Sequence, residues 1–78
     1  MKLSKDLEKI IDDNCYVVMR CLNLRTHTSR ESAREMIVNF EKYIDGMEVQ
    51  GFDIARYREY ITGFMIAYET KYKEEYKR

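Results

Sequence analysis

The 78-residue chain contains no proline, no tryptophan and only three glycines. Proline and glycine are the residues that most disfavour a helix interior, so their scarcity leaves long stretches that can stay helical without a break. Glu, Lys, Arg, Met, Leu and Ile, which favour helices, are abundant. Apolar residues make up 45% of the chain, which excludes a disordered polypeptide. The composition therefore predicts a single all-helical domain.

A net charge and a long apolar run are also missing. The chain has 14 basic and 14 acidic residues, so its formal charge is zero and no overall field attracts nucleic acid. No apolar stretch approaches the roughly 18 residues that a membrane span requires. The first residues lack the apolar core of a signal peptide. We therefore expect a cytoplasmic protein.

Cysteine and histidine are too few to predict a disulfide or a metal site. Cys15 and Cys21 lie in one predicted helix, about 9 Å apart along its axis. Disulfide Cα atoms are rarely more than about 7 Å apart, so the two cysteines are predicted to be unpaired and packed like small apolar residues. His27, the only histidine, does not share a helix face with them. No cofactor or metal is expected.

No pattern typical of an enzyme is present. The sequence has no P-loop, no glycine-rich nucleotide-binding turn and no zinc-protease motif. Nothing near His27 supplies both a nucleophile and an orienting acid. We expect a protein without enzymatic activity.

Start and stop signals divide the chain into three helices over residues 4–24, 29–50 and 54–76. Ser4 and Asp53 are predicted N-caps of the first and third helices. Thr28 and Glu31 form a predicted capping box for the second. The fold expected from these boundaries is an all-α, three-helix antiparallel bundle that spans residues 1–78 as one domain.

The end of the second helix is predicted from its glycines. If Gly51 adopts the left-handed conformation just past the end, Met47 and Phe52 occupy the two positions that touch in a Schellman motif. Ending the helix at Gly46 would set Met47 against Lys42, which is a poorer match. Gly51 is therefore the predicted stop, and the short connection that follows favours an antiparallel helix pair.

The first helix carries a broad apolar arc. A heptad seam of alternating four- and three-residue spacings is predicted at its centre: Leu3, Leu7, Ile10, Asn14, Val17, Cys21 and Leu24. A second apolar row lies beside the seam: Ile11, Val18 and Leu22. Asn14 has two interpretations. It pairs with its own copy across a two-fold axis, or, as we favour, its amide is satisfied within one subunit.

The third helix has an equally broad arc, which is built largely of tyrosine. Its members are Ile54, Tyr57, Ile61, Phe64, Met65, Tyr68, Tyr72 and Tyr76, widened by Tyr60 and Ala67. We expect Tyr57, Tyr68 and Tyr72 in the core with their hydroxyls at its rim. Gly63 is interpreted as a tolerated surface glycine, although its spacing to Ala67 would admit a close helix neighbour.

The second helix differs, because its apolar stripe is only about 120° wide. Its predicted members are Ala33, Met36, Ile37, Phe40, Tyr43, Ile44 and Met47. A three-helix monomer covers about a third of each helix, which leaves apolar surface on the first and third helices uncovered. We therefore predict a homodimer through those two helices. The predicted dimer or partner interface consists of Asn14, Val17, Cys21, Tyr60, Phe64, Ala67 and Tyr76.

The favoured function is that of a small regulatory, adaptor or inhibitory protein that binds another macromolecule through helical surfaces. An accessory protein of a phage or mobile element would fit such a chain. The alternative is binding of nucleic acid or another anionic ligand by a basic cluster in which Glu31 is the single acid. Its members are Arg20, Arg25, His27, Arg30 and Arg34. A solvated, self-capped turn is the competing interpretation of that cluster.

Overall fold

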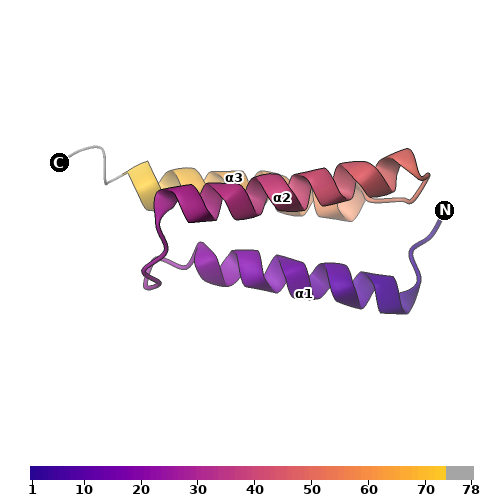
Figure 1. Ribbon diagram of the computed structural model, residues 1–78, viewed down its shortest axis with the longest axis horizontal. Coiled ribbons are helices and arrows are strands. Elements are labelled where there is room, and N and C mark those ends of the chain that lie inside the picture. Colours follow the sequence, from indigo (N-terminus) through magenta and orange to yellow (C-terminus); the bar gives the residue numbers. More distant parts are fainter. Residues whose placement is uncertain (74–78) are drawn as a thin grey trace.

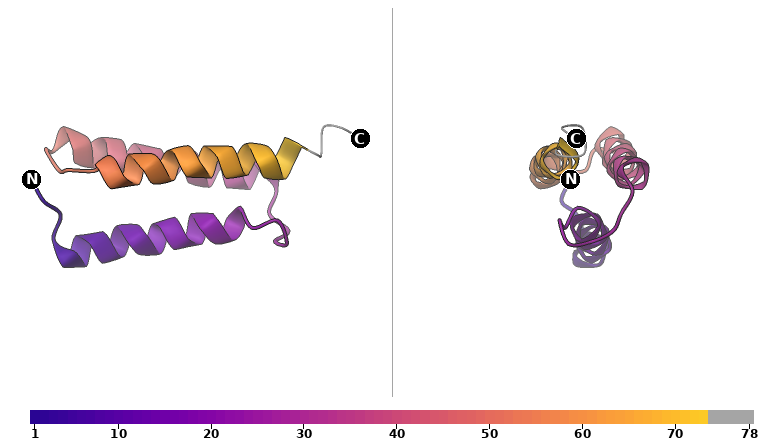
Figure 2. Two further views of the ribbon diagram at one scale, coloured as in Figure 1. Left: turned by 180° about the vertical axis from the view of Figure 1, so that it is seen from behind. Right: turned by 90° about the vertical axis from the view of Figure 1, so that its left-hand side faces the viewer.

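The computed structural model describes residues 1–73 and contains three α-helices, α1 (Lys5–Cys21), α2 (Arg30–Val49) and α3 (Ala55–Lys73). The helices run alternately up and down the long axis of the molecule (Figure 1). Seen along that axis, they occupy the corners of a triangle (Figure 2). The bundle is elongated, with extents of 47 × 19 × 16 Å. The predicted all-α, three-helix antiparallel bundle is confirmed.

The helix starts agree only in part with the predicted caps. Ser4 caps α1, because its hydroxyl accepts a hydrogen bond from the Leu7 amide at 3.2 Å. In α2 the cap is Ser29, whose hydroxyl accepts from the Ser32 amide at 3.1 Å. The predicted capping box of Thr28 and Glu31 is therefore wrong, and α2 starts one residue later than that box requires.

The end of α1 also differs from the prediction. α1 ends at Cys21 rather than residue 24, and residues 22–29 form the connection to α2. α3 begins at Ala55, one residue later than predicted, and the Asp53 carboxylate accepts a hydrogen bond from the Ala55 amide at 3.3 Å from two positions before the helix. The predicted end of the third helix at residue 76 lies outside the described residues.

The predicted Schellman motif after α2 is confirmed. Gly51 has a φ of 92°, which is the left-handed conformation that glycine adopts without strain. The Phe52 amide donates to the Met47 carbonyl at 3.1 Å, and the Gly51 amide donates to the Glu48 carbonyl at 2.9 Å. Both Met47 and Phe52 pack against the core. The turn sets the antiparallel pairing of α2 and α3.

All three helices contribute to one apolar core. Ile11, Ile44, Tyr57 and Tyr72 are its most deeply buried large side chains. Most of the predicted α2 stripe is buried, but Tyr43 remains 40% exposed. The predicted centre of α1 is wrong. The buried residues of α1 are instead those of the second row, Ile11, Val18 and Leu22, together with Cys15.

The middle of the heptad seam lies instead on the flank of α1, whereas Leu3 and Leu7 at its N-terminal end pack against the core. Ile10 is 52% exposed and Val17 is 46% exposed. An arc half a turn wide contains two adjacent apolar rows, and the positions of α2 and α3 determine which row points inward. Because the second row points between those two helices, the seam is displaced toward solvent on the side of α2.

Both ends of the bundle are fastened by polar contacts to the main chain. At one end the Met1 ammonium donates to the Gly51 carbonyl at 2.8 Å. At the other end the Tyr72 hydroxyl donates to the carbonyl of Thr28 at 2.8 Å. These contacts hold the chain segments next to the helices in fixed positions. Over residues 1–73, no helix combines the length and apolarity that crossing a membrane requires.

Candidate binding surfaces

A groove with a volume of about 550 Å³ lies between α1 and α3. We call it the α1–α3 groove. Its lining comes from the C-terminal end of α1 and the middle of α3 and consists of Met19, Leu22, Asn23, Glu59, Tyr60, Gly63, Phe64 and Ala67. Apart from Asn23 and Glu59, the lining residues are apolar or, in the case of Tyr60, aromatic with a single hydroxyl. The groove is therefore suited to an apolar ligand.

The floor and rims of the α1–α3 groove differ in exposure. Leu22 and Phe64 are 7% exposed each and form buried parts of the lining. Met19 is 60% exposed and Tyr60 is 39% exposed, so both stand at the rims. Gly63 leaves open space, because a Cβ placed there would meet no atom within 4 Å.

A polar network links α1 to α3 beside the N-terminal part of the groove. The Arg56 guanidinium forms an ion pair with Asp12 at 2.6 Å and lies over the ring of Tyr60, 5.6 Å from its centre. The Tyr57 hydroxyl donates to Asp12 at 3.3 Å. Burial raises the pKa of Tyr57 to about 12, with Asp12 adding to the rise and Arg56 opposing it. The network bridges the two helices beside the groove.

A smaller hollow of about 180 Å³ lies between α1 and α2. Asn14 and Val17 line it from α1, while Met36, Asn39 and Tyr43 line it from α2. Neither asparagine side chain takes part in a hydrogen bond within residues 1–73. The favoured interpretation of Asn14 is an amide that is satisfied within one subunit by another side chain or by a water, and a side-chain partner is not found among the described residues. The amide is exposed and stays available to solvent or to a partner.

The structure does not bring the residues of the predicted interface together on one surface. Tyr60, Phe64 and Ala67 come together in the α1–α3 groove. Asn14 and Val17 lie in the hollow between α1 and α2. Cys21 lines a third hollow next to Tyr16 and Arg20, while Tyr76 lies outside the described residues.

Sequence reasoning missed Met19 and Asn39, which complete the two surfaces. Both lie directly beside a buried residue in the sequence, Met19 after Val18 and Asn39 before Phe40. The sequence signal for Met19 was its position directly after Val18, on the side of the second apolar row that faces away from the heptad seam. This position becomes informative only when it is known that the second row of α1 is the buried one.

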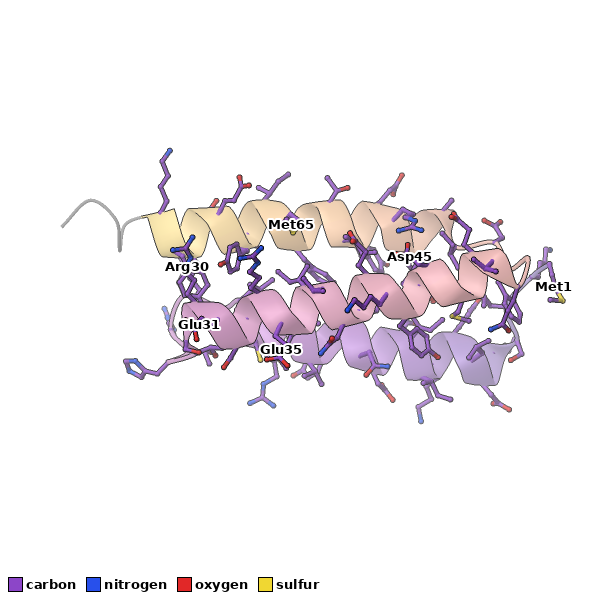
Figure 3. The ribbon with its side chains drawn as sticks, turned by 45° about the horizontal axis from the view of Figure 1, so that its top comes forward. Met1, Arg30, Glu31, Glu35, Asp45 and Met65 are labelled. Atoms are coloured by element: carbon purple, nitrogen blue, oxygen red, sulfur yellow. The ribbon has the colours of Figure 1, made fainter. Side chains whose placement is uncertain are left out.

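The predicted basic cluster gathers largely at one end of the bundle, where α1 ends and α2 begins (Figure 1). Arg20, Arg25, His27 and Arg30 belong to this end, and Arg34 lies one turn further along α2. The Arg30 guanidinium donates from Nε to the Tyr68 hydroxyl at 3.0 Å. In Figure 3 Arg30 accordingly points toward α3. The Ser29 hydroxyl caps α2, which fits the self-capped interpretation of the turn.

The metal-ligand and cysteine side chains of the described residues are arranged as follows. Within residues 1–73, no three His, Cys, Asp or Glu side chains are arranged to hold a metal ion. Cys15 and Cys21 are unpaired, as predicted. Burial raises the pKa of the Cys15 thiol to about 11, which leaves it protonated and unreactive near neutral pH.

No protein-family model, curated protein or solved structure matches the chain. We therefore infer its function from the chemistry and shape of its surfaces.

Proposed function

We propose that this chain is a small non-enzymatic protein that binds an amphipathic helix of another protein in the α1–α3 groove, and thereby acts as a regulator, adaptor or inhibitor. Helices commonly bind helical partners by inserting an apolar face into an apolar groove. The α1–α3 groove has the buried floor and the exposed apolar rims that such binding needs. It is also bounded by two helices that the Arg56–Asp12 ion pair ties together.

The observation that carries this proposal is the glycine in the middle of α3. A glycine in a helix interior costs about 1 kcal/mol relative to alanine. Nothing lies within 4 Å of the Cβ that an alanine would add at Gly63, so the bundle itself does not require a glycine there. A partner backbone that lies close to α3 does require one. Ala67, four residues on, lies on the same side of α3 and lines the same groove.

The rims indicate the chemistry of the partner. Met19 adapts to differently shaped apolar side chains, and Tyr60 offers a large contact area with a polar tip. Glu59 forms no ion pair within the described residues, so its carboxylate can receive a basic side chain. We therefore expect a partner helix with apolar residues at three- and four-residue spacings and a lysine or arginine beside them.

The proposal is tested by affinity capture from the source cell with three matched baits. The baits are the natural chain, Gly63→Leu and Gly46→Leu. Gly46 also lies within a helix and also has no atom within 4 Å of an added Cβ, but it is in α2, away from the groove. We expect a partner that the natural chain and Gly46→Leu retain and that Gly63→Leu loses. A partner retained equally by all three baits would refute binding in the groove.

Binding of nucleic acid or another anionic ligand is the second candidate, and it is supported by the position of Arg20, Arg25 and His27 around the end of α1 and the connection to α2. Two contacts weaken it. Lys71, the nearby cation on α3, donates its hydrogen bonds to main-chain carbonyls, and Arg30 donates to Tyr68. The second candidate is tested below by a salt titration.

A further inference from the structure

The side of the bundle between α1 and α2 presents a face without charge. We call it the α1–α2 face, and it consists of Ile10, Asn14, Val17, Met36, Asn39 and Tyr43. Ile10 belongs to it because it lies one helical turn before Asn14. Across the whole chain 36% of residues are charged, so six neighbouring positions without a charge form an unusual surface. Ile10, Val17 and Tyr43 are 52%, 46% and 40% exposed, which leaves apolar area in contact with water.

Four charged residues border the α1–α2 face. Asp13 and Arg20 lie seven residues apart along the outer edge of α1, and Glu35 and Lys42 lie seven residues apart along the outer edge of α2. Figure 3 shows Glu35 on the side of α2 opposite α3. All four are exposed, and none forms an ion pair within residues 1–73.

The antiparallel arrangement makes these charges alternate around the face. Arg20 is next to the end of α1 and lies across the face from the N-terminal turns of α2, which contain Glu35. Asp13 is in the middle of α1 and lies across from Lys42 in the middle of α2. Each corner therefore has the opposite sign to the corner directly across the face. When a second copy is rotated by 180° about an axis parallel to the helices and placed on this face, each charge meets one of opposite sign.

We propose that a second copy of this chain covers the α1–α2 face, related by a two-fold axis parallel to the helices. In this arrangement α1 of one copy lies against α2 of the other. Arg20 then meets Glu35 of the second copy, and Asp13 meets Lys42 of the second copy. A two-fold interface forms every contact twice, so two such charge pairs become four.

The asparagines fit the same arrangement. Asn14 and Asn39 line one hollow from opposite helices, so they lie near the same level of the bundle. The two-fold axis sets Asn14 opposite Asn39 of the second copy, where two amides can donate to and accept from one another. A polar pair inside an apolar interface fixes its register, as it does in coiled coils. An unrelated partner would have to supply both the amides and the charges in this order, whereas a second copy supplies them by symmetry.

Sedimentation equilibrium tests the proposal with a matched pair of variants. We expect the natural chain to be dimeric at about 100 μM. Val17→Glu should be monomeric and keep its helical circular dichroism, because Val17 is already 46% exposed. Val38→Glu is the control, since Val38 is 39% exposed on α2 but lies outside the α1–α2 face. A monomeric natural chain, or equal weakening by the two variants, would overturn the proposal.

Charge exchange tests the position of the two-fold axis. Arg20→Glu should raise the dimer dissociation constant by on the order of tenfold. The substitution replaces the attraction between Arg20 and Glu35 of the second copy by repulsion, and the two-fold axis makes this change occur twice in each dimer. Adding Glu35→Arg should restore the dimer. Rescue by Asp13→Arg in place of Glu35→Arg would mean that α1 lies against α1 of the second copy, and the proposed axis would be wrong. Gly63→Leu, which blocks the α1–α3 groove, should leave the dimer unchanged, so this proposal and the proposed function fail separately.

Discussion

The ammonium group of Lys71, in the last turn of α3, donates a hydrogen bond to the main-chain carbonyl of Cys21, the last residue of α1, at 2.8 Å. It also donates to the carbonyls of Asn23 and Thr26, each at 3.0 Å. A cation at a helix C-terminus satisfies carbonyls that have no partner within the helix and complements the helix dipole. One side chain of α3 therefore caps α1 and orders the connection between α1 and α2.

Replacing this lysine should destabilise the fold. We expect Lys71→Met to lower the free energy of unfolding by about 2 kcal/mol, since hydrogen bonds from a charged donor contribute more than neutral ones. Urea denaturation followed by circular dichroism measures the change. Lys73→Met is the control, because Lys73 is exposed in the same last turn and no contact of its side chain with the connection is seen. Equal effects of the two substitutions would show that the carbonyl contacts contribute nothing.

Neighbouring isoleucines in α1 test which of its rows is buried. Ile11 is fully buried, whereas Ile10 is 52% exposed. We expect Ile11→Ala to cost about 3 kcal/mol and Ile10→Ala less than about 1 kcal/mol in the monomer. Thermal and urea unfolding at low protein concentration, where dimer dissociation does not contribute, provide the comparison. A larger loss of stability from Ile10→Ala than from Ile11→Ala would show that the heptad seam is buried, and would contradict this fold.

The three glycines should respond to alanine with opposite signs. Gly51→Ala should destabilise by roughly 1–2 kcal/mol, because its φ of 92° is strained for a residue with a Cβ. Gly46→Ala and Gly63→Ala should each stabilise by about 0.5–1 kcal/mol, since both lie in helices with open space around an added Cβ. Melting temperatures give the signs directly. Destabilisation by Gly63→Ala would mean that α3 needs its glycine for the fold, which would remove the main support for the groove.

Alkaline pH should weaken the fold through two buried acids. The folded chain keeps the Cys15 thiol protonated up to a pKa of about 11, compared with an ordinary value of 9.0. Burial likewise raises the pKa of Tyr57 from 10.0 to about 12. Above the ordinary values the unfolded chain binds fewer protons than the folded chain, so the free energy of unfolding falls as pH rises. The decline should run from about pH 9 to about pH 12.

A tyrosine variant isolates part of this pH dependence. Tyr57→Phe should flatten the decline between pH 10 and 12, because that variant has no phenol to deprotonate. Tyr16→Phe is the control, since Tyr16 is 61% exposed. Urea midpoints at several pH values compare the slopes. An identical slope in Tyr57→Phe and the natural chain would contradict the raised pKa.

Binding to random duplex DNA separates the two candidate functions. We expect no binding tighter than about 100 μM at physiological salt, because the net charge is zero and the nearby Lys71 and Arg30 are engaged within the chain. Fluorescence anisotropy over a range of salt concentrations measures the affinity. Micromolar binding that falls steeply with salt, and that disappears in an Arg25→Ala, Arg30→Ala double variant, would favour the anion-binding candidate instead.

The sequence by itself determined the three helices, the turn at Gly51 and the buried stripe of α2. Helix composition and capping signals act locally, and a glycine in the left-handed conformation ends a helix in any context. The α2 stripe is about 120° wide, which leaves little choice of which side faces inward. Local physics was sufficient for these features.

Only the tertiary structure decided which row of α1 is buried and which exposed residues share a surface. Two apolar rows of α1 differ by a single residue, or about 100° of rotation, and both satisfy the same periodicity. The choice between them depends on where α2 and α3 lie, which is set by the packing of all three helices. The same packing brings Tyr60 and Met19 to one groove and Asn14 and Asn39 to one hollow, because the grouping of distant residues depends on the rotation of each helix about its own axis.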